Sequence, residues 1–323
     1  EFYVFEAADF ASHINDSHFT MLSPERFFQN AYHACNPHVV HDDFRDEACT
    51  LMREIGVDIR YHHHEVGALG QQEIEGWFAD LPTTCDHAVM TKYILFNLAH
   101  QKGLRVTFMP KPLYDNAGSG WHLHQFLAKG GRNIFNDPKG YAGLSKTALC
   151  YIGGILRHSQ ALCAFTNPST NSYKRLVPGF EAPTARTFGR SNRGAAIRVP
   201  TYVADPEYRR MEYRPPDFTC NPYLCVAAIL MAGIDGVLGG IDPEQDGHRP
   251  EDAPSPDQLK TAAFLPRSLD DALDALARDH EFLLRNGVFP EPLIHRWIEI
   301  KRQEIQAINR RPHPYEFTMY FDL

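Results

Sequence analysis

The chain has 323 residues, of which 43% are hydrophobic and 22% are charged, and its formal net charge is −8. These proportions are typical of a globular protein, and the acidic balance argues against a nucleic-acid partner. No run of about 18 apolar residues is present, so no membrane span is predicted. Seven cysteines without a C-x-x-C pair indicate reduced thiols in a cytoplasmic protein, rather than a disulfide framework or a zinc ribbon.

The first part of the chain alternates predicted strands and helices. Polar and apolar residues alternate over Glu1–Glu6 and predict a strand. Because this strand is already under way at residue 1, we expect the sequence to begin inside a longer protein. The next predicted elements are a helix at residues 23–35 that starts at Ser23-Pro24, a helix at His41–Ile55, a hairpin of strands Asp58–Val66 and Gln71–Phe78, a helix at Thr84–Lys102, and strands at Leu104–Met109 and Trp121–Leu127.

The second part of the chain is richer in helix. Its predicted elements are a long apolar helix at Ser145–Phe165, strands at Ala195–Val199 and Arg209–Arg214, a buried helix at Pro222–Leu238, an exposed loop at 241–258, amphipathic helices at Leu269–Arg285 and Glu291–Ile308, and a closing strand at Glu316–Phe321. This mixture predicts one large α+β unit, with an antiparallel sheet and helices packed on one side of it.

The predicted hairpin carries the strongest local signal of chemistry. Side chains two residues apart on a strand share a face, so His63 lies with Glu65, and Gln71 lies with Glu73 and Glu75. A tight turn can bring Glu65 and Glu73 together, and adjacent carboxylates repel unless a cation or a proton lies between them. The pattern is equally compatible with a divalent metal site and with a solvated polar hairpin.

A second signal is the segment Gly118-Ser-Gly-Trp-His-Leu-His124. Its glycines allow a ligand to approach the backbone closely, and His122 and His124 would share one strand face. A histidine pair of this kind is more often structural than functional. The G-x-x-x-x-G-K-[ST] spacing of a phosphate-binding loop is absent.

A third signal is a group of arginines in apolar segments. Arginine forks bind carboxylates and phosphates in a bidentate manner, although the same residues can form surface ion pairs worth about 0–1 kcal/mol each. Together with the carboxylates and histidines, they suit Mg²⁺ or Mn²⁺ and phosphoryl transfer from a nucleotide. The residues alone therefore predict a metal-dependent, ATP-using enzyme with an acidic substrate. The arginines are Arg175, Arg193, Arg198, Arg210 and Arg214.

Several longer segments, in order along the whole chain, carry a family resemblance. They are His63–Val66 with Gly70-Gln71 and Glu73, Met109–Pro112, Gly118–His122, Asn167–Pro183, Asn192–Pro200, Glu212–Asp217 with Asn221–Leu224, and His313–Phe317. This succession resembles the catalytic domain of the type I glutamine synthetases. The segment 167–183 is the most specific part of the match.

The resemblance implies an open, funnel-like active site of antiparallel strands with helices outside, filling residues 1–323 as a C-terminal catalytic domain. It further implies an N-terminal β-grasp domain upstream of this sequence and a cytoplasmic double ring of subunits with active sites at their interfaces. The implied activity belongs to glutamine biosynthesis and nitrogen metabolism. ATP phosphorylates glutamate to γ-glutamyl phosphate, and ammonia then displaces phosphate to give glutamine.

Matching motif positions give each candidate site residue an implied role. One metal ion would be held by Glu1, Glu65 and Glu73, and the other by His122 and Glu212, with the family's further glutamate falling before residue 1. Glutamate would be bound by Gly118, Arg175, Arg193 and Arg214, and ATP by His124, Arg198 and Arg210. Glu181 would act with Arg193 in catalysis, because it matches the flap glutamate that shields the intermediate and helps to deprotonate ammonium.

The chain departs from the family pattern at several positions. Ala117 replaces an asparagine, Trp121 a methionine, Phe126 a serine and Glu207 a lysine near the phosphates. The regulatory tyrosine segment is absent from residues 239–266, so no control by adenylylation is predicted. Ala117 and Glu207 keep two alternatives open, which are a ligase that joins glutamate to amines such as polyamines and a catalytically silent homologue.

Two features of the sequence weigh against these alternatives. The flap segment around Glu181 is intact, which favours ammonia as the acceptor. The metal-site carboxylates all persist, and buried unpaired carboxylates would be costly in a protein that binds no metal.

Overall fold

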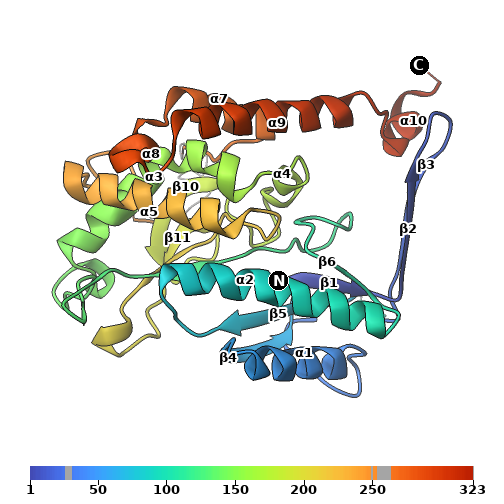
Figure 1. Cartoon of the computed structure of the whole chain (residues 1–323), viewed down its shortest axis with the longest axis horizontal. Coiled ribbons are helices and arrows are strands. Elements are labelled where there is room, and N and C mark those ends of the chain that lie inside the picture. Colours follow the sequence, from blue (N-terminus) through green and yellow to red (C-terminus); the bar gives the residue numbers. More distant parts are fainter. Residues whose placement is uncertain (26–30, 249, 253–262, 323) are drawn as a thin grey trace. The chain divides into compact units, whose positions relative to one another are not determined.

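The computed structural model describes residues 1–25, 31–248, 250–252 and 263–322 (Figure 1). The chain divides into two compact units. Unit 1 contains Glu1–Ser119 and Arg302–Leu323, and unit 2 contains Gly120–Lys301. Each unit combines helices with a four-stranded sheet, which confirms the predicted α+β class.

The sheet of unit 1 is antiparallel and has the strand order β4-β5-β1-β6. The strand β1, which is buried along its whole length, lies inside this sheet. In the predicted hairpin of β4 and β5, His63 lies opposite Glu73 and His64 opposite Gln72. The strands are β1 (Phe2–Phe5), β4 (Ile59–His64), β5 (Gln71–Gly76) and β6 (Arg105–Thr107).

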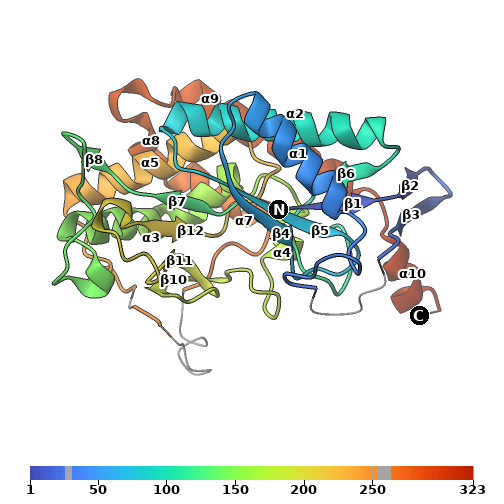
Figure 2. The ribbon, with the colours of Figure 1, turned by 90° about the horizontal axis from the view of Figure 1, so that it is seen from below.

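Two helices pack against this sheet and against each other. They are α1 (Asp42–Glu54), which contacts β4, and α2 (Leu81–Gln101), which contacts β6. Both lie on the same side of the sheet (Figure 2). The side chain of Asp80 caps α2 by accepting a hydrogen bond from the Thr83 backbone N–H at 2.9 Å, so α2 begins three residues before the prediction.

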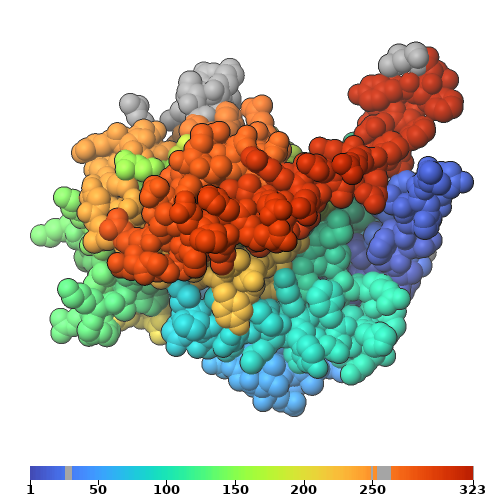
Figure 3. Space-filling model, turned by 45° about the horizontal axis from the view of Figure 1, so that its top comes forward, coloured from blue at the N-terminus to red at the C-terminus, as the bar shows by residue number. Residues whose placement is uncertain are grey.

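A hairpin and the last helix of unit 1 expose apolar side chains. The hairpin, which the sequence analysis missed, joins β2 (Ala7–Ser12) to β3 (Ser17–Leu22). The helix is α10 (Pro314–Tyr320). Both project from the surface in Figure 3, the hairpin in blue and the helix in red. Their large exposed residues are Phe10, Ile14, Phe19, Leu22, Tyr315, Phe317, Met319, Tyr320 and Phe321.

The sheet of unit 2 has the strand order β10-β11-β12-β7. The pairs β11–β12 and β12–β7 are antiparallel as expected, whereas β10 and β11 are parallel. The strands are β7 (Leu123–Gln125), β10 (Ala185–Arg190), β11 (Ala195–Val199) and β12 (Met211–Tyr213), and a separate short hairpin joins β8 (Ala128–Lys129) to β9 (Arg132–Asn133).

Two apolar helices, α3 (Lys146–Thr166) and α5 (Pro222–Gly239), form the core of unit 2. They meet at Gly154 and Gly236, where a Cβ added to Gly154 would lie 2.6 Å from the Gly236 nitrogen, so only glycine allows this approach. By length and composition alone, α5 could cross a membrane, and among the described residues it alone passes that test. Core helices pass it too, and α5 packs on α3.

The remaining helices follow the chain around this core. They are the short helix α4 (Ser172–Arg175), α7 (Leu269–Arg278), α8 (Glu281–Leu284) and α9 (Glu291–Asn309). Three 3₁₀ turns complete the described elements, at Tyr141–Gly143, Pro206–Tyr208 and Arg285–Gly287.

Some predicted elements differ from the structure. The closing strand at Glu316–Phe321 is wrong, because His313 accepts a hydrogen bond from the Tyr315 N–H and caps α10. The helix predicted at 269–285 is interrupted at Asp279-His280. The helix predicted at 23–35 is not helical at 23–25 or 31–35, and its middle lies outside the described residues.

The loop predicted at 241–258 is only partly exposed. Ile241 and His248 are buried, and the His248 Nδ1 lies 3.0 Å from the Arg186 carbonyl oxygen. Residues 253–258 of this prediction lie outside the described residues.

Candidate active site

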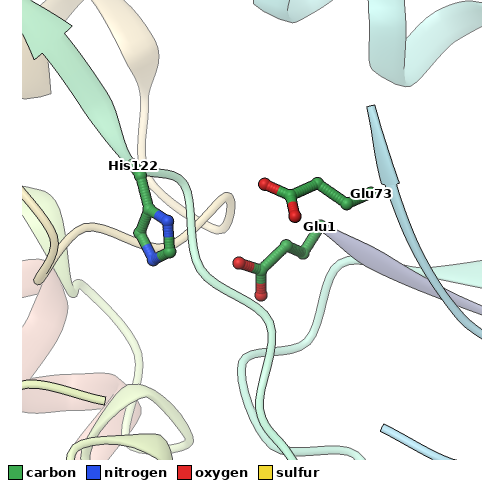
Figure 4. A group of neighbouring side chains, drawn as sticks. All are labelled: Glu1, Glu73 and His122. Carbon is green, nitrogen blue, oxygen red and sulfur yellow. The ribbon is translucent and has the colours of Figure 1, made fainter. Parts of the chain in front are cut away.

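Unit 1 brings together the carboxylates predicted for the first metal site. Antiparallel pairing of β1 with β5 sets Tyr3 opposite Gln71, so Glu1 and Glu73 are neighbours across the two strands. Their carboxylate oxygens lie within 4.8 Å of each other, and Figure 4 shows the two side chains pointing the same way. Glu65 follows β4 in the turn. We call Glu1, Glu65 and Glu73 the carboxylate cluster.

Electrostatics in the carboxylate cluster favour a shared proton or a cation. Burial raises the pKa of Glu65 to about 9, and the neighbouring Glu1 and Glu73 charges add to this effect. Burial would also raise the pKa of Glu73, but hydrogen bonds from His63 and Glu65 lower it overall. The distance from His63 Nε2 to Glu73 Oε2 is 3.2 Å. A cluster of oxygen ligands whose charges repel one another fits a hard divalent cation.

The segment 116–119 is hydrogen-bonded to the hairpin of β4 and β5 and to β1. The Tyr3 hydroxyl donates to the Ala117 carbonyl oxygen at 2.6 Å, and the Asn116 amide donates to the Ala68 carbonyl oxygen at 2.7 Å. The Gln71 amide donates to the Gly118 carbonyl oxygen at 3.0 Å. The glycine that the family resemblance predicts to bind substrate is therefore hydrogen-bonded to the strand that carries Glu73.

Unit 2 brings together His122 and Glu212, the residues predicted for the second metal site. His122 precedes β7 (Figure 4) and Glu212 lies in β12, where it pairs with His124. The His122 Nδ1 is 3.6 Å from Glu212 Oε1. Burial, with the Arg214 and Arg175 guanidinium groups, lowers the pKa of His122 well below its usual value, so the ring is neutral as a metal ligand must be.

Two arginines engage Glu212. The Arg198 Nη1 donates to Glu212 Oε2 at 2.8 Å, and Arg214 donates to Glu212 Oε1. Burial alone would raise the pKa of Glu212, but Arg214, His124 and Arg198 lower it. The described part of unit 2 therefore offers two donors for a metal ion, His122 and Glu212, and an arginine pair that already balances the carboxylate charge.

Glu181, the predicted flap glutamate, lies beside the predicted glutamate-binding arginines. The Arg193 Nη1 is 3.2 Å from Glu181 Oε2, and the Arg214 Nη2 donates to the Glu181 carbonyl oxygen at 3.3 Å. The Arg214 Nε donates to the Arg193 carbonyl oxygen at 2.9 Å. Arg175 is buried, and its Nη2 donates to the Arg214 carbonyl oxygen at 3.2 Å. These contacts bring the predicted catalytic and glutamate-binding residues of unit 2 into one connected network.

The predicted ATP-binding residues form the other end of this network. The Arg210 Nε donates to His124 Nδ1 at 3.2 Å. The ring of Tyr202 lies 5.6 Å from the Arg198 guanidinium carbon and 5.8 Å from that of Arg210. The Arg198 Nε is buried without a hydrogen-bond partner among the described residues. A buried cationic donor with an unused N–H suits an anionic ligand.

The structure shows the contacts of three residues that depart from the family pattern. Ala117 places its carbonyl oxygen, not a side chain, on Tyr3. Trp121 packs edge-on against Phe218, with ring centroids 5.0 Å apart. Glu207 is exposed, and its carbonyl oxygen accepts a hydrogen bond from Asn133 at 3.0 Å. The structure therefore leaves the Glu207 carboxylate in solvent.

Several residues that support the site were not predicted from the sequence. Tyr3 and Gln71 fix the segment 116–119, and Tyr202 contacts both predicted phosphate-binding arginines. Gln71 belongs to a motif of the family resemblance, but nothing in the sequence indicated which groups its amide would contact. Tyr202 follows the Arg198 segment directly, and its position there is its only sequence signal.

Comparisons with known proteins agree with this geometry. A family model described as "Glutamine synthetase, catalytic domain" matches residues 1–320. The glutamine synthetase of Frankia alni is 46% identical over 92% of this chain and 63% of its own length. That of Mycolicibacterium smegmatis is 42% identical over the whole chain and 72% of its own length. The solved glutamine synthetase of Plasmodium falciparum has a TM-score of 0.89 at 27% identity, covering 99% of this chain and 73% of that one.

The fold, the site and these matches define the catalytic domain of an ATP-dependent ligase. The chain belongs to the glutamine synthetase family. It spans about two thirds of the length of the relatives it matches.

Proposed function

We propose that the native protein that carries this chain is a glutamate–ammonia ligase, which converts glutamate, ammonia and ATP into glutamine, ADP and phosphate. The observation that carries the proposal is the connected network of unit 2, in which Glu181 contacts Arg193 and Arg214. The relatives named glutamine synthetase, at 41–47% identity, support the same reaction.

The reaction proceeds in two steps. An oxygen of the glutamate γ-carboxylate attacks the γ-phosphorus of ATP, the bond to ADP breaks, and γ-glutamyl phosphate forms. The nitrogen of ammonia then attacks the acyl carbon, and phosphate leaves. Both transition states carry negative charge on phosphoryl or carbonyl oxygens, and positioned guanidinium groups stabilise such charge.

The arginines divide these tasks between the two substrates. Arg175, Arg193 and Arg214 bind the carboxylates of glutamate, and Gly118 offers its backbone to glutamate. Arg198, Arg210 and His124 bind the phosphates of ATP. The buried, unpaired Nε of Arg198 supports this division, because a phosphate oxygen can satisfy it.

Glu181 has two roles in the proposed reaction, which are to accept a proton from ammonium and to help to exclude water. Its backbone adopts φ = 56°, and its side chain is largely exposed beside Arg193. From this position the carboxylate accepts a proton from ammonium, and the flap shields the acyl phosphate from hydrolysis.

The metal donors of the two units support a requirement for Mg²⁺ or Mn²⁺. Glu1, Glu65 and Glu73 would hold one ion, and His122 and Glu212 would contribute to a second. When bound, these ions neutralise phosphoryl oxygens and orient ATP.

We also propose that the protein assembles into stacked rings with active sites at subunit interfaces, and that it is cytoplasmic. Exposed apolar side chains on the β2–β3 hairpin and on α10 support the assembly, because such patches mark interaction surfaces. The free cysteines among the described residues support a reducing compartment.

The first test supplies the native protein with ATP, Mg²⁺ and glutamate, and offers ammonium and putrescine together. Mass spectrometry identifies the products. Glutamine as the dominant product is expected. A γ-glutamyl amine as the main product would replace the proposal with the amine ligase, and intact ATP with neither product would indicate the silent homologue.

A further inference from the structure

Gln71 uses its side-chain amide to join three parts of unit 1. The residue is only 1% exposed. Its Oε1 accepts a hydrogen bond from the Gly67 backbone N–H at 2.7 Å, in the turn between β4 and β5. Its Nε2 lies 3.0 Å from the Gly118 carbonyl oxygen, 3.3 Å from Ser119 Oγ and 3.4 Å from Glu1 Oε2.

The chemistry of these contacts requires an amide in one orientation. Gly67 presents a donor, whereas Gly118 and Glu1 present acceptors, so the amide oxygen must face Gly67. The NH₂ group has two hydrogens for three acceptors, which it shares. Movement of the Glu1 carboxylate therefore changes how strongly the amide can hold Gly118, and the converse also holds.

The neighbouring Gln72 shows what a purely structural glutamine does in the same strand. It is fully buried, faces the other side of β5 and accepts a hydrogen bond from Arg45. Among the described residues, the Gln72 side chain forms no hydrogen bond with the carboxylate cluster or with the segment 116–119. The two glutamines share a strand, a residue type and a degree of burial, and they differ in what their amides touch.

We propose that Gln71 is a positioning residue that couples cation binding at the carboxylate cluster to glutamate binding at Gly118. This inference rests on the proposed function. A cation that draws Glu1 towards itself changes the hydrogen bond that Glu1 accepts from the Gln71 amide. The amide then sets the position of the Gly118 carbonyl oxygen. Because coupling between two ligands is reciprocal, glutamate strengthens cation binding by the same factor.

The experiment measures this coupling factor in the native protein. Calorimetry gives the glutamate dissociation constant without divalent ions and at saturating Mn²⁺, and the Mn²⁺ dissociation constant with and without glutamate. The wild type is expected to show the same factor in both directions, within the roughly 5- to 150-fold range usual for linked sites.

Two variants and a matched control decide the outcome. Gln71→Met keeps the size and burial of the side chain but removes the amide, so the coupling factor is expected to fall towards 1. Gln72→Met makes the same change on the opposite face, and its coupling factor is expected to match the wild type. If Gln71→Met does not fold, Gln71→Glu keeps the shape and replaces the donor by an acceptor, and Gln72→Glu, which adds the same charge on the opposite face, becomes its matched control.

The results that would overturn the inference are distinct from those that would overturn the function. Wild-type coupling in Gln71→Met, or equal losses of coupling in both methionine variants, would leave Gln71 with a structural role alone. A wild-type protein that forms glutamine but shows no coupling would also refute the inference. If the wild type binds no glutamate at all, the proposed function fails, and the inference fails with it.

Discussion

The two units balance the charge of their site carboxylates in opposite ways. In unit 1, Glu65 lies beside two other carboxylates and keeps its proton, with a pKa of about 9. In unit 2, Glu212 is engaged by Arg198 and Arg214, which lower its pKa. Unit 1 therefore depends on a proton or an added cation for charge balance, whereas unit 2 supplies its own cations. A glutamate can thus be suited to binding a cation, as in unit 1, or to stabilising the fold through ion pairs, as in unit 2.

The largest expected effect is on stability in unit 2. Glu212→Ala leaves the buried Arg214 and the partly buried Arg198 without their carboxylate, and breaking a buried pair in this way costs about 3–5 kcal/mol of unfolding free energy. Urea unfolding of the metal-free protein followed by circular dichroism measures the loss. Glu299→Ala, which removes an exposed partner of Arg296, is the control and should change stability by less than about 0.5 kcal/mol. Equal stability of the two variants would refute the contrast.

The corresponding change in unit 1 should separate stability from activity. Glu65→Gln resembles the protonated carboxyl in shape and charge, so metal-free stability should stay within about 0.5 kcal/mol of the wild type. Activity should fall by more than the roughly 10–100-fold typical for residues that merely support a metal ligand. Glutamine formation at saturating Mg²⁺ measures this effect. An active Glu65→Gln variant would remove Glu65 from the metal ligands.

The raised pKa of Glu65 also predicts a pH dependence. The folded, metal-free protein holds a proton between the ordinary carboxyl pKa and about 9 that the unfolded chain has released, so its stability falls as pH rises through this window. A divalent cation must displace that proton, so its affinity should rise by about tenfold per pH unit below pH 9. Calorimetry between pH 6.5 and 8.5 measures the slope. The slope should disappear in Glu65→Gln, and an unchanged slope there would assign the proton to another group.

The smallest expected effect is on ATP binding and concerns Glu207 in unit 2. Glu207→Lys reverses an exposed negative charge in the segment that precedes Arg210, so the KM for ATP should fall about 2- to 5-fold, as expected for a single solvated charge. Steady-state kinetics at low salt measures the change, and Glu299→Lys controls for net charge. A loss of the effect at high salt would support its electrostatic origin, whereas equal effects of both lysines would refute a local role for Glu207.

Much of the fold was predictable because local signals set its elements. The hairpin of β4 and β5 follows from alternation around a Gly-Ala-Leu-Gly turn, and the end of α2 follows from Gly103, which adopts φ = 70°. The strand β10 was missed, and its parallel pairing with β11 is not encoded in the residue pattern of one strand. The segment 316–321 alternates like a strand but has a helix cap before it.

The candidate site was predictable to a similar degree. Alternation on the hairpin placed Glu65 and Glu73 together, and the family resemblance gave the arginines their expected roles. The arginine partners of Glu212 and the contacts of Gln71 depend on segments tens of residues apart. No periodicity within one segment carries that information, so these contacts appear only in the folded chain.

The glycine contact between α3 and α5 has a consequence for how this domain tolerates change. Most packed surfaces accommodate a substitution by rotating side chains, but Gly154 and Gly236 meet backbone to backbone and have none to rotate. The spacing of these two helices is therefore a fixed dimension. The helix α3 also contacts β10, which lies next to the strand that carries Arg198. A change in the spacing of α3 and α5 would therefore displace the sheet. The precision of the arginine network is thus set partly by two residues without side chains.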